Sequence, residues 1–541
     1  MRIVCVAVAC AALLATAAPP VAAQHEHGSS LAEQFGTVHF PTSCDTSGAA
    51  GFERAVAMLH SFAYAPAARA FAAIAARDPG CPMAQWGIAM SYFHTVWGPP
   101  TPDEFAAGRA ASRRADSLAA HADARDRDWI AATHAYYAGD DAPHATRVEA
   151  FESAMAGVAQ RYPDDHEAQV FHALALLAVA YNSPPDKSYA RQKQAAAILN
   201  RLLPLEPRHP GIAHYMIHSF DYPELADLAL PAARAYSKLA PASPHALHMP
   251  SHIYTRLGLW RESVAANIAS ARLAQGWVAR TRPGATAFDA MHAMDYLEYA
   301  YLQLGQDAAA RAIVDSARAA HEFDVASFQA GYALAAIPTR YALERRAWSD
   351  AAALELPAAF PWARYPYEEA IVHFGRAVGA ARSGDVEGAT RAVARLEQLH
   401  ASLAGQKGFD WATQVEIQRR AAAGWLARAG RHDDDAIALL RSAADLEDAT
   451  DKHSVTPGPV LPAREQLADL LLELDRPAAA LVEYRASMRG SPARLGSYLG
   501  AAEAAERAGH ADEATDLRAH AVVMCGGAVP ARPRPGPGAA R

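Results

Sequence analysis

The chain has 541 residues, of which 51% are hydrophobic and 20% are charged, and its formal net charge is −8. A single compact core stops growing near about 250–300 residues, so this length indicates several domains or an elongated array. The net charge is negative and no basic stripe appears, which argues against a nucleic-acid partner.

Residues 1–23 have the pattern of a secretory signal peptide. Arg2 precedes an apolar run, and the small residues Val21, Ala22 and Ala23 end it. The run is short for a membrane span and breaks at two prolines, and no later stretch is apolar enough to cross a bilayer. We therefore predict cleavage after Ala23 and a secreted or periplasmic protein without a membrane span.

An extended lead-in over residues 24–49 is expected to precede the first helices. It contains Cys44, and Cys81 follows the first predicted helical hairpin. An exported chain meets an oxidising compartment, so we favour a disulfide between these two cysteines, with Cys525 left over. Three cysteines permit three pairings, and the sequence alone does not choose among them.

From about residue 50 onward, helix signals run almost to the end of the chain and strand signals are nearly absent. Periodic apolar blocks come in pairs, and the pairs recur at intervals of roughly 34–50 residues, the mark of a helical repeat array. A single helix pair cannot bury its apolar face, whereas stacked pairs share a continuous core.

The units resemble tetratricopeptide repeats (TPR). The first, GFERAVAMLHSFAYAPAARAFAAIAARDPG, places Ala55, Ala67, Phe71 and Pro79 at the family's small, aromatic and closing-proline positions, and a late unit reads PAREQLADLLLELDRPAAALVEYRASM. The resemblance implies an all-α, right-handed superhelical solenoid of antiparallel helix pairs, whose concave groove holds a protein, peptide or small ligand. The central segment is also similar to uncharacterised secreted bacterial TPR proteins.

We expect two arrays, residues 50–355 and residues 366–525, separated by the proline-rich segment LPAAFPWARYP. Residues 526–541 are rich in proline, glycine and arginine and are predicted to be disordered.

Histidines concentrate in the centre of the chain. Helical spacing of four places His214 over His218, and His248 over His252, on one face of each helix. Pro250 lies between the second pair and is expected to bend that helix.

The register of the repeats places most of these histidines at equivalent positions of successive units. Starts of units fall at Pro210, Pro244 and Met291, and the resemblance implies that the second, fifth and ninth positions of each first helix point into the groove. Six of these nine positions are histidine. The nine residues are Gly211, His214, His218, His245, His248, His252, His292, Asp295 and Tyr299.

Neutral imidazole is the commonest protein ligand for zinc, copper, nickel and iron, so the cluster predicts a transition-metal site. The predicted ligands are His214, His218, His248, His252 and His292, with Asp295 as ligand or supporting residue. His245, near the start of its helix, is a weaker candidate. Other residues flanking the groove are Tyr215, Asp221, Tyr222, Arg256, Glu298 and Tyr299; they could orient the imidazoles.

Two other interpretations of the histidines remain open: a groove for an anionic or peptide ligand, and a buried structural polar network. The sequence carries no HExxH motif, phosphate-binding loop or nucleophile elbow. The leading hypothesis is an extracytoplasmic binding module with a metal site. The alternatives are a metal-dependent enzyme, hydrolase or oxidase, with Glu298 or Asp295 as acid or base, and a plain protein-interaction scaffold.

Overall fold

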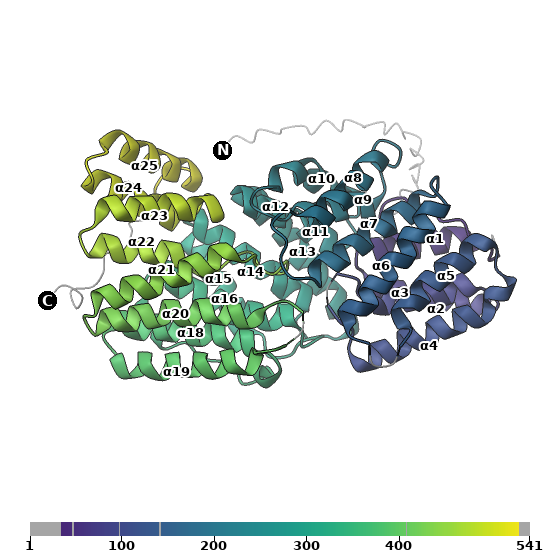
Figure 1. The fold of residues 1–541 in the computed structure, drawn as a ribbon, viewed down its shortest axis with the longest axis horizontal. Helices are drawn as coiled ribbons and strands as arrows, with labels where there is room; N and C mark the ends of the chain where they lie inside the picture. The colour runs from purple at the N-terminus through teal and green to yellow at the C-terminus, as the bar shows by residue number, and fades with distance from the viewer. Residues whose placement is uncertain (1–33, 46–47, 97, 140–141, 407, 530–541) are drawn as a thin grey trace, which may run out of the picture.

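A computed structural model describes residues 34–45, 48–96, 98–139, 142–406 and 408–529. The predicted signal peptide, residues 24–33 of the lead-in and residues 530–541 of the tail lie outside this part of the chain. The described residues form α-helices joined by short turns (Figure 1). This confirms the predicted all-α array.

The helices of the first half are α1 (Ala49–His60), α2 (Tyr64–Arg77), α3 (Pro82–Phe93), α4 (Pro102–Leu118), α5 (Ala124–Tyr137), α6 (His144–Arg161), α7 (His166–Tyr181), α8 (Ala190–Leu202), α9 (Pro210–Phe220), α10 (Ala226–Leu239), α11 (Pro244–His248), α12 (Pro250–Leu257) and α13 (Trp260–Thr281).

Those of the second half are α14 (Phe288–Gln303), α15 (Asp307–Ala319), α16 (Phe328–Glu344), α17 (Trp348–Ala352), α18 (Pro366–Ser383), α19 (Val386–Leu403), α20 (Trp411–Ala429), α21 (Asp433–Ala449), α22 (Ala463–Glu473), α23 (Pro477–Gly490), α24 (Leu495–Arg507) and α25 (Ala511–Cys525). Short 3₁₀ turns lie at Ala119–His121 and Trp362–Arg364.

Each helix packs against its successor, and alternate helices such as α14, α16, α18 and α20 lie side by side. Small residues permit the close crossings. A Cβ atom on Gly87 would lie 2.3 Å from the ring of Phe71, and one on Gly500 would lie 2.3 Å from the ring of Tyr484. A side chain at either glycine would push the two helices apart.

Two of the three predicted unit starts coincide with the start of a helix, whereas α14 begins at Phe288, three residues before the predicted start at Met291. Helices α9 and α11 begin at Pro210 and Pro244, where proline suits the first helical turn because its missing N–H would have no partner there. Pro250 divides the second of these units into α11 and α12, so the predicted bend between His248 and His252 is present.

The array also closes on itself at two places. Helix α1 contacts α9, and α14 contacts α24. At the second closure Arg494 Nη1 donates to the Tyr299 hydroxyl at 2.9 Å, and the Leu495 N–H donates to Gln303 Oε1 at 2.9 Å. The inner face of α14 is therefore covered by other helices, which corrects the expectation of an open groove at Glu298 and Tyr299.

The lead-in packs against the first helices rather than extending into solvent. Phe35, Val38 and Phe40 are buried, although residues 34–45 form no helix. The structure joins Cys44 to Cys81 by a disulfide across a sequence separation of 37 residues, and Cys525 is free.

The apolar core is continuous across residues 355–366, where the sequence predicts a division. One hydrophobic cluster runs from Tyr332 to Ala514, and a second from Met291 to Phe360. The largest cluster ends at Tyr254. In the described part of the chain, no helix is both long enough and apolar enough to cross a membrane.

Helix α18 carries a buried acid. Glu368 on α18 is only 2% exposed, its Oε1 has no hydrogen bond within the described structure, and burial raises its pKa to about 8. The folded protein therefore keeps a proton on Glu368 that the unfolded chain loses near its ordinary pKa of 4.5.

The Glu368→Gln variant is expected to flatten the pH dependence of stability. Between the two pKa values the folded state binds more protons, so the free energy of unfolding of the natural protein falls as pH rises. Denaturant titrations should find the variant more stable by about 4 kcal/mol at pH 8 and by only about 1 kcal/mol at pH 5. An equal difference at both pH values would contradict a protonated Glu368.

Candidate metal centre

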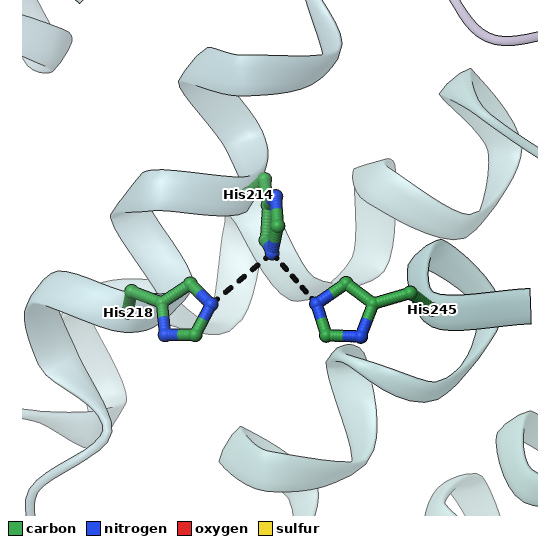
Figure 2. A group of neighbouring side chains, drawn as sticks. All are labelled: His214, His218 and His245. Atoms are coloured by element: carbon green, nitrogen blue, oxygen red, sulfur yellow. Dashed lines mark hydrogen bonds between the residues drawn. The ribbon is translucent and has the colours of Figure 1, made fainter. Parts of the chain in front are cut away.

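The predicted histidines converge as two separate groups of three. His214, His218 and His245 form the first group, and His248, His252 and His292 form the second. In each group, one nitrogen of every ring lies within 4.8 Å of the other two. Figure 2 shows the first group, with ring nitrogens of His218 and His245 directed toward His214 Nε2.

In the first group, the partners of His214 fix where its proton lies. His214 Nδ1 is 2.6 Å from the backbone carbonyl oxygen of His60, and a carbonyl can only accept. The proton is therefore on Nδ1, and Nε2 carries a lone pair. Because α1 contacts α9, this carbonyl reaches the ring from a helix more than 150 residues away.

His218 has the same tautomer. The Tyr181 hydroxyl donates its proton to the backbone carbonyl of His218 at 3.1 Å, so at 3.2 Å it accepts from His218 Nδ1. Nε2 of His218 is then also unprotonated, and it lies 3.1 Å from Nε2 of His214. Two lone pairs face each other, with no hydrogen to place between them. Nε2 of His245 lies 3.0 Å from the same His214 nitrogen.

The second group repeats this arrangement with different partners. Asn267 donates its amide to the Ser263 carbonyl, so its oxygen accepts from His248 Nδ1 at 2.7 Å. Asp221 accepts from His252 Nδ1 at 3.0 Å. The two Nε2 atoms of His248 and His252, both unprotonated, are 3.0 Å apart.

His292 completes the second group. Its ring centroid is 4.3 Å from that of His248. Its Nδ1 is buried and finds no hydrogen-bond partner among the described residues. A buried ring nitrogen without a partner costs free energy unless an ion or water satisfies it.

All six rings are neutral near pH 7. Burial lowers the pKa of each below its ordinary value of 6.5, and neighbouring imidazoles lower most of them further. The pKa of His218 falls to about 3, chiefly by burial, with a further contribution from His252. An imidazolium proton therefore does not explain the facing nitrogens of His214 and His218 or of His248 and His252, whereas a neutral His245 can donate from Nε2 to His214. Two nitrogens bound to one ion at ~2.0–2.1 Å lie roughly 3.3–3.6 Å apart, a few tenths of an ångström wider than the 3.0–3.1 Å between the facing Nε2 atoms here.

The carboxylate of Asp221 is held in place by two cationic side chains, one of which is distant in the sequence. Arg256 Nε donates to Asp221 Oδ1 at 2.9 Å, and Lys452 Nζ lies 3.2 Å from Oδ2. Burial alone would raise the pKa of Asp221, but Lys452 and Arg256 hold it well below its usual range. Lys452 belongs to the segment between α21 and α22, so the C-terminal part of the chain contributes a residue to this centre.

A third histidine group provides a contrast. His60 Nε2 and His209 Nε2 lie 2.9 and 2.8 Å from the two carboxylate oxygens of Glu167. His60 Nδ1 accepts from the Tyr215 hydroxyl at 2.9 Å, and His209 Nδ1 accepts from the Ile212 N–H. Each ring nitrogen faces a suitable partner, so this group is complete without an ion.

Asp295 is not a member of either group, which corrects its predicted role as ligand or supporting residue. Its Oδ1 accepts from Arg340 Nη1 at 2.8 Å, and the same nitrogen donates to Glu298 Oε2 at 2.8 Å. All three side chains are fully buried, and a buried carboxylate is stabilised most strongly by a cationic partner. His245, the weaker candidate, lies in the first group.

The remaining predicted groove residues make internal contacts. Tyr215 belongs to the Glu167 network, Arg256 holds Asp221, and Glu298 is paired with Arg340. Tyr222 accepts from Gln192 at 2.9 Å, and Tyr299 accepts from Arg494. These contacts fix the helices around the histidines rather than line an open groove.

No protein-family model matches the chain, and no curated protein matches it. Among solved structures, a human IFIT1 dimer with PPP-AAAA is 10% identical, with a TM-score of 0.36, covering 87% of this chain and 89% of its own. An IFIT1 monomeric mutant with Gppp-AAAA is 12% identical, with a TM-score of 0.39; the match covers 82% of this chain and 90% of the IFIT1 chain. A chain of the APC/C hetero-tetramer Cut9–Hcn1 is 11% identical, with a TM-score of 0.29; the match covers 88% of this chain and 93% of that one. The likeness concerns the helical arrangement alone.

Proposed function

We propose that this chain is an exported helical module that binds transition-metal ions in two buried sites of three histidines each. The facing lone pairs of His214 and His218 carry the proposal, together with the same arrangement at His248 and His252. Two lone pairs at this distance repel each other, and a metal cation between them accepts both. Export rests on the leader pattern of residues 1–23.

The donor set suits zinc, copper, nickel or iron, since imidazole is a good ligand for each. The partners of the second ring nitrogens support the sites as well. Metal-binding histidines usually donate their other N–H to a carboxylate, carbonyl or similar acceptor, as His252 does to Asp221 and His214 to the His60 carbonyl.

A cavity away from the two histidine groups could hold a protein segment, a peptide or a small ligand. A cavity of about 280 Å³ lies between α14, α16, α22 and α24, and its lining combines leucines with Trp348, Arg345 and Glu465. This cavity is the proposed binding position for such a ligand, in place of the covered face at the histidines.

A metal-dependent enzyme is the second candidate. Three protein ligands at each ion leave a coordination position open, as in catalytic zinc sites, and a bound water or substrate could occupy it. Screening the metal-loaded protein for hydrolase and oxidase activity, with a metal-free variant as control, separates this candidate from a binding module.

The proposal is tested on the full chain purified without a histidine tag. The protein is loaded with each metal in turn, desalted and subjected to elemental analysis. We expect two ions per chain, one for each three-histidine group. The double variant His218→Ala, His252→Ala removes one ligand from each site and should hold close to none.

His321→Ala is the matched control, because His321 is exposed and lies outside both groups. It should retain the full metal content. A double variant that keeps two ions per chain would refute the site assignment, and a natural protein that binds none would leave a helical interaction scaffold.

A further inference from the structure

The two three-histidine groups are unusual in the charge of their donors. Each offers three neutral imidazoles, and no carboxylate or thiolate of the described residues joins either group. Whatever ion they hold therefore brings its whole charge into the protein interior. The six rings are between 0% and 9% exposed, so water compensates little of that charge.

The nearest anionic group is already neutralised. Asp221 accepts from His252, and its carboxylate also contacts Arg256 and Lys452. Two cations for one carboxylate leave this side of the second site net positive. The Lys452 side chain is only 8% exposed, and burial lowers its pKa to about 8. The protein interior therefore disfavours the positive charge even of this ammonium group.

The two groups are also neighbours. The ring centroids of His245 and His248, one from each group, are 6.5 Å apart. Two ions in these sites would repel each other across a poorly screened interior. Both that repulsion and the desolvation cost scale with the product of charges, so each is about four times larger for divalent than for monovalent ions.

We propose that the two groups bind copper(I), one ion in each, and that they select it over divalent metals. Copper(I) is the monovalent member of the set that imidazole binds well, and it accepts three ligands in a plane. Zinc(II) prefers four ligands in a tetrahedron and would need a further ligand at each site. Iron(II) sites of this kind usually include a carboxylate, which these groups lack. The inference rests on the proposed metal-binding function and names its metal.

The test is a competitive titration of the untagged full chain under anaerobic conditions. Copper(I) is added against a coloured copper(I) chelator, and zinc(II) against a coloured zinc(II) chelator. We expect two copper(I) ions per chain, held at least about a hundredfold more tightly than zinc(II). X-ray absorption at the copper edge should give a copper(I) spectrum with three nitrogen neighbours.

Single variants assign the ions. His218→Ala and His252→Ala should each reduce copper(I) from two ions per chain to one. His209→Ala alters the Glu167 network instead and should keep both ions if it folds, which circular dichroism verifies. Should His209→Ala unfold, His321→Ala takes its place as the control.

The outcomes separate the two claims. Zinc(II) bound in two sites as tightly as copper(I) overturns the copper(I) selectivity and leaves the metal-binding function intact. One copper ion shared by all six rings also overturns the inference. Failure of every metal to bind overturns both the inference and the function beneath it.

Discussion

Loading the protein with its metal should raise its free energy of unfolding by about 4 kcal/mol per site when free metal exceeds the dissociation constant a thousandfold. Two filled sites would give about 8 kcal/mol, which is comparable to the whole stability of many domains. The reason is that the ion binds the folded state, where the Nε2 atoms of His214 and His218, and of His248 and His252, face each other, in preference to the unfolded chain. Thermal unfolding with and without metal measures the effect.

The double variant His218→Ala, His252→Ala is the control for this prediction. It should show no stabilisation by metal, and its apo form should lose less than a usual buried truncation, because two repulsive contacts disappear with the rings. If metal stabilised the variant as much as the natural protein, the ions would be bound elsewhere in the chain.

The Arg340→Met variant should lose about 3–5 kcal/mol of unfolding free energy near pH 8. Arg340 is fully buried, and one nitrogen of its guanidinium donates to both Asp295 and Glu298, so a single positive charge serves two acids. Burial raises the pKa of both acids, that of Glu298 to about 8. Removing Arg340 leaves both acids in the interior without a cationic partner, where Oδ2 of Asp295 and Oε1 of Glu298 already have no hydrogen bond within the described structure. Urea titration at several pH values gives the loss, which should shrink at acidic pH as the carboxylates take up protons.

Two comparisons make this result specific. The triple variant Arg340→Met, Asp295→Asn, Glu298→Gln removes all three charges and should recover much of the lost stability. Arg311→Met breaks the exposed pair with Asp315, about half of each side chain being in solvent, and should cost less than about 1 kcal/mol. Equal losses for Arg340→Met and Arg311→Met would show that the buried cluster is not a strong ion-pair network.

The helical architecture could be predicted because its signals are local. Apolar periodicity, first-turn prolines and small residues at crossings each act within one helix pair. Pro210 and Pro244 marked the starts of α9 and α11, and the pairing of Pro250 with a helix break also followed from local geometry. The closure of α14 on α24 could not be predicted, since it depends on the curvature accumulated over many repeats.

The histidines of the centre could be predicted from spacing and register, but their grouping could not. Whether His245 pairs with His214 or with His248 depends on how far apart two helices lie and how Pro250 turns the chain. The position of Asp295 depended on Arg340, which arrives from another helix. A one-dimensional register cannot anticipate such a competing partner.

The partners that fix the ring tautomers had almost no sequence signal. Asp221 stood beside the cluster and was a natural candidate. Tyr181, Asn267 and Lys452 lie on other helices or on a distant turn, and nothing in their immediate surroundings distinguishes them from ordinary polar residues. They are recognised only when their hydrogen bonds are known.

The most direct test of the account is anomalous X-ray diffraction from crystals of the metal-loaded chain. We predict two peaks, each within roughly 2.0–2.1 Å of three imidazole nitrogens. One peak should lie among His214, His218 and His245, and the other among His248, His252 and His292. Empty density at both positions in crystals soaked with excess metal, with the six rings unmoved, would contradict it.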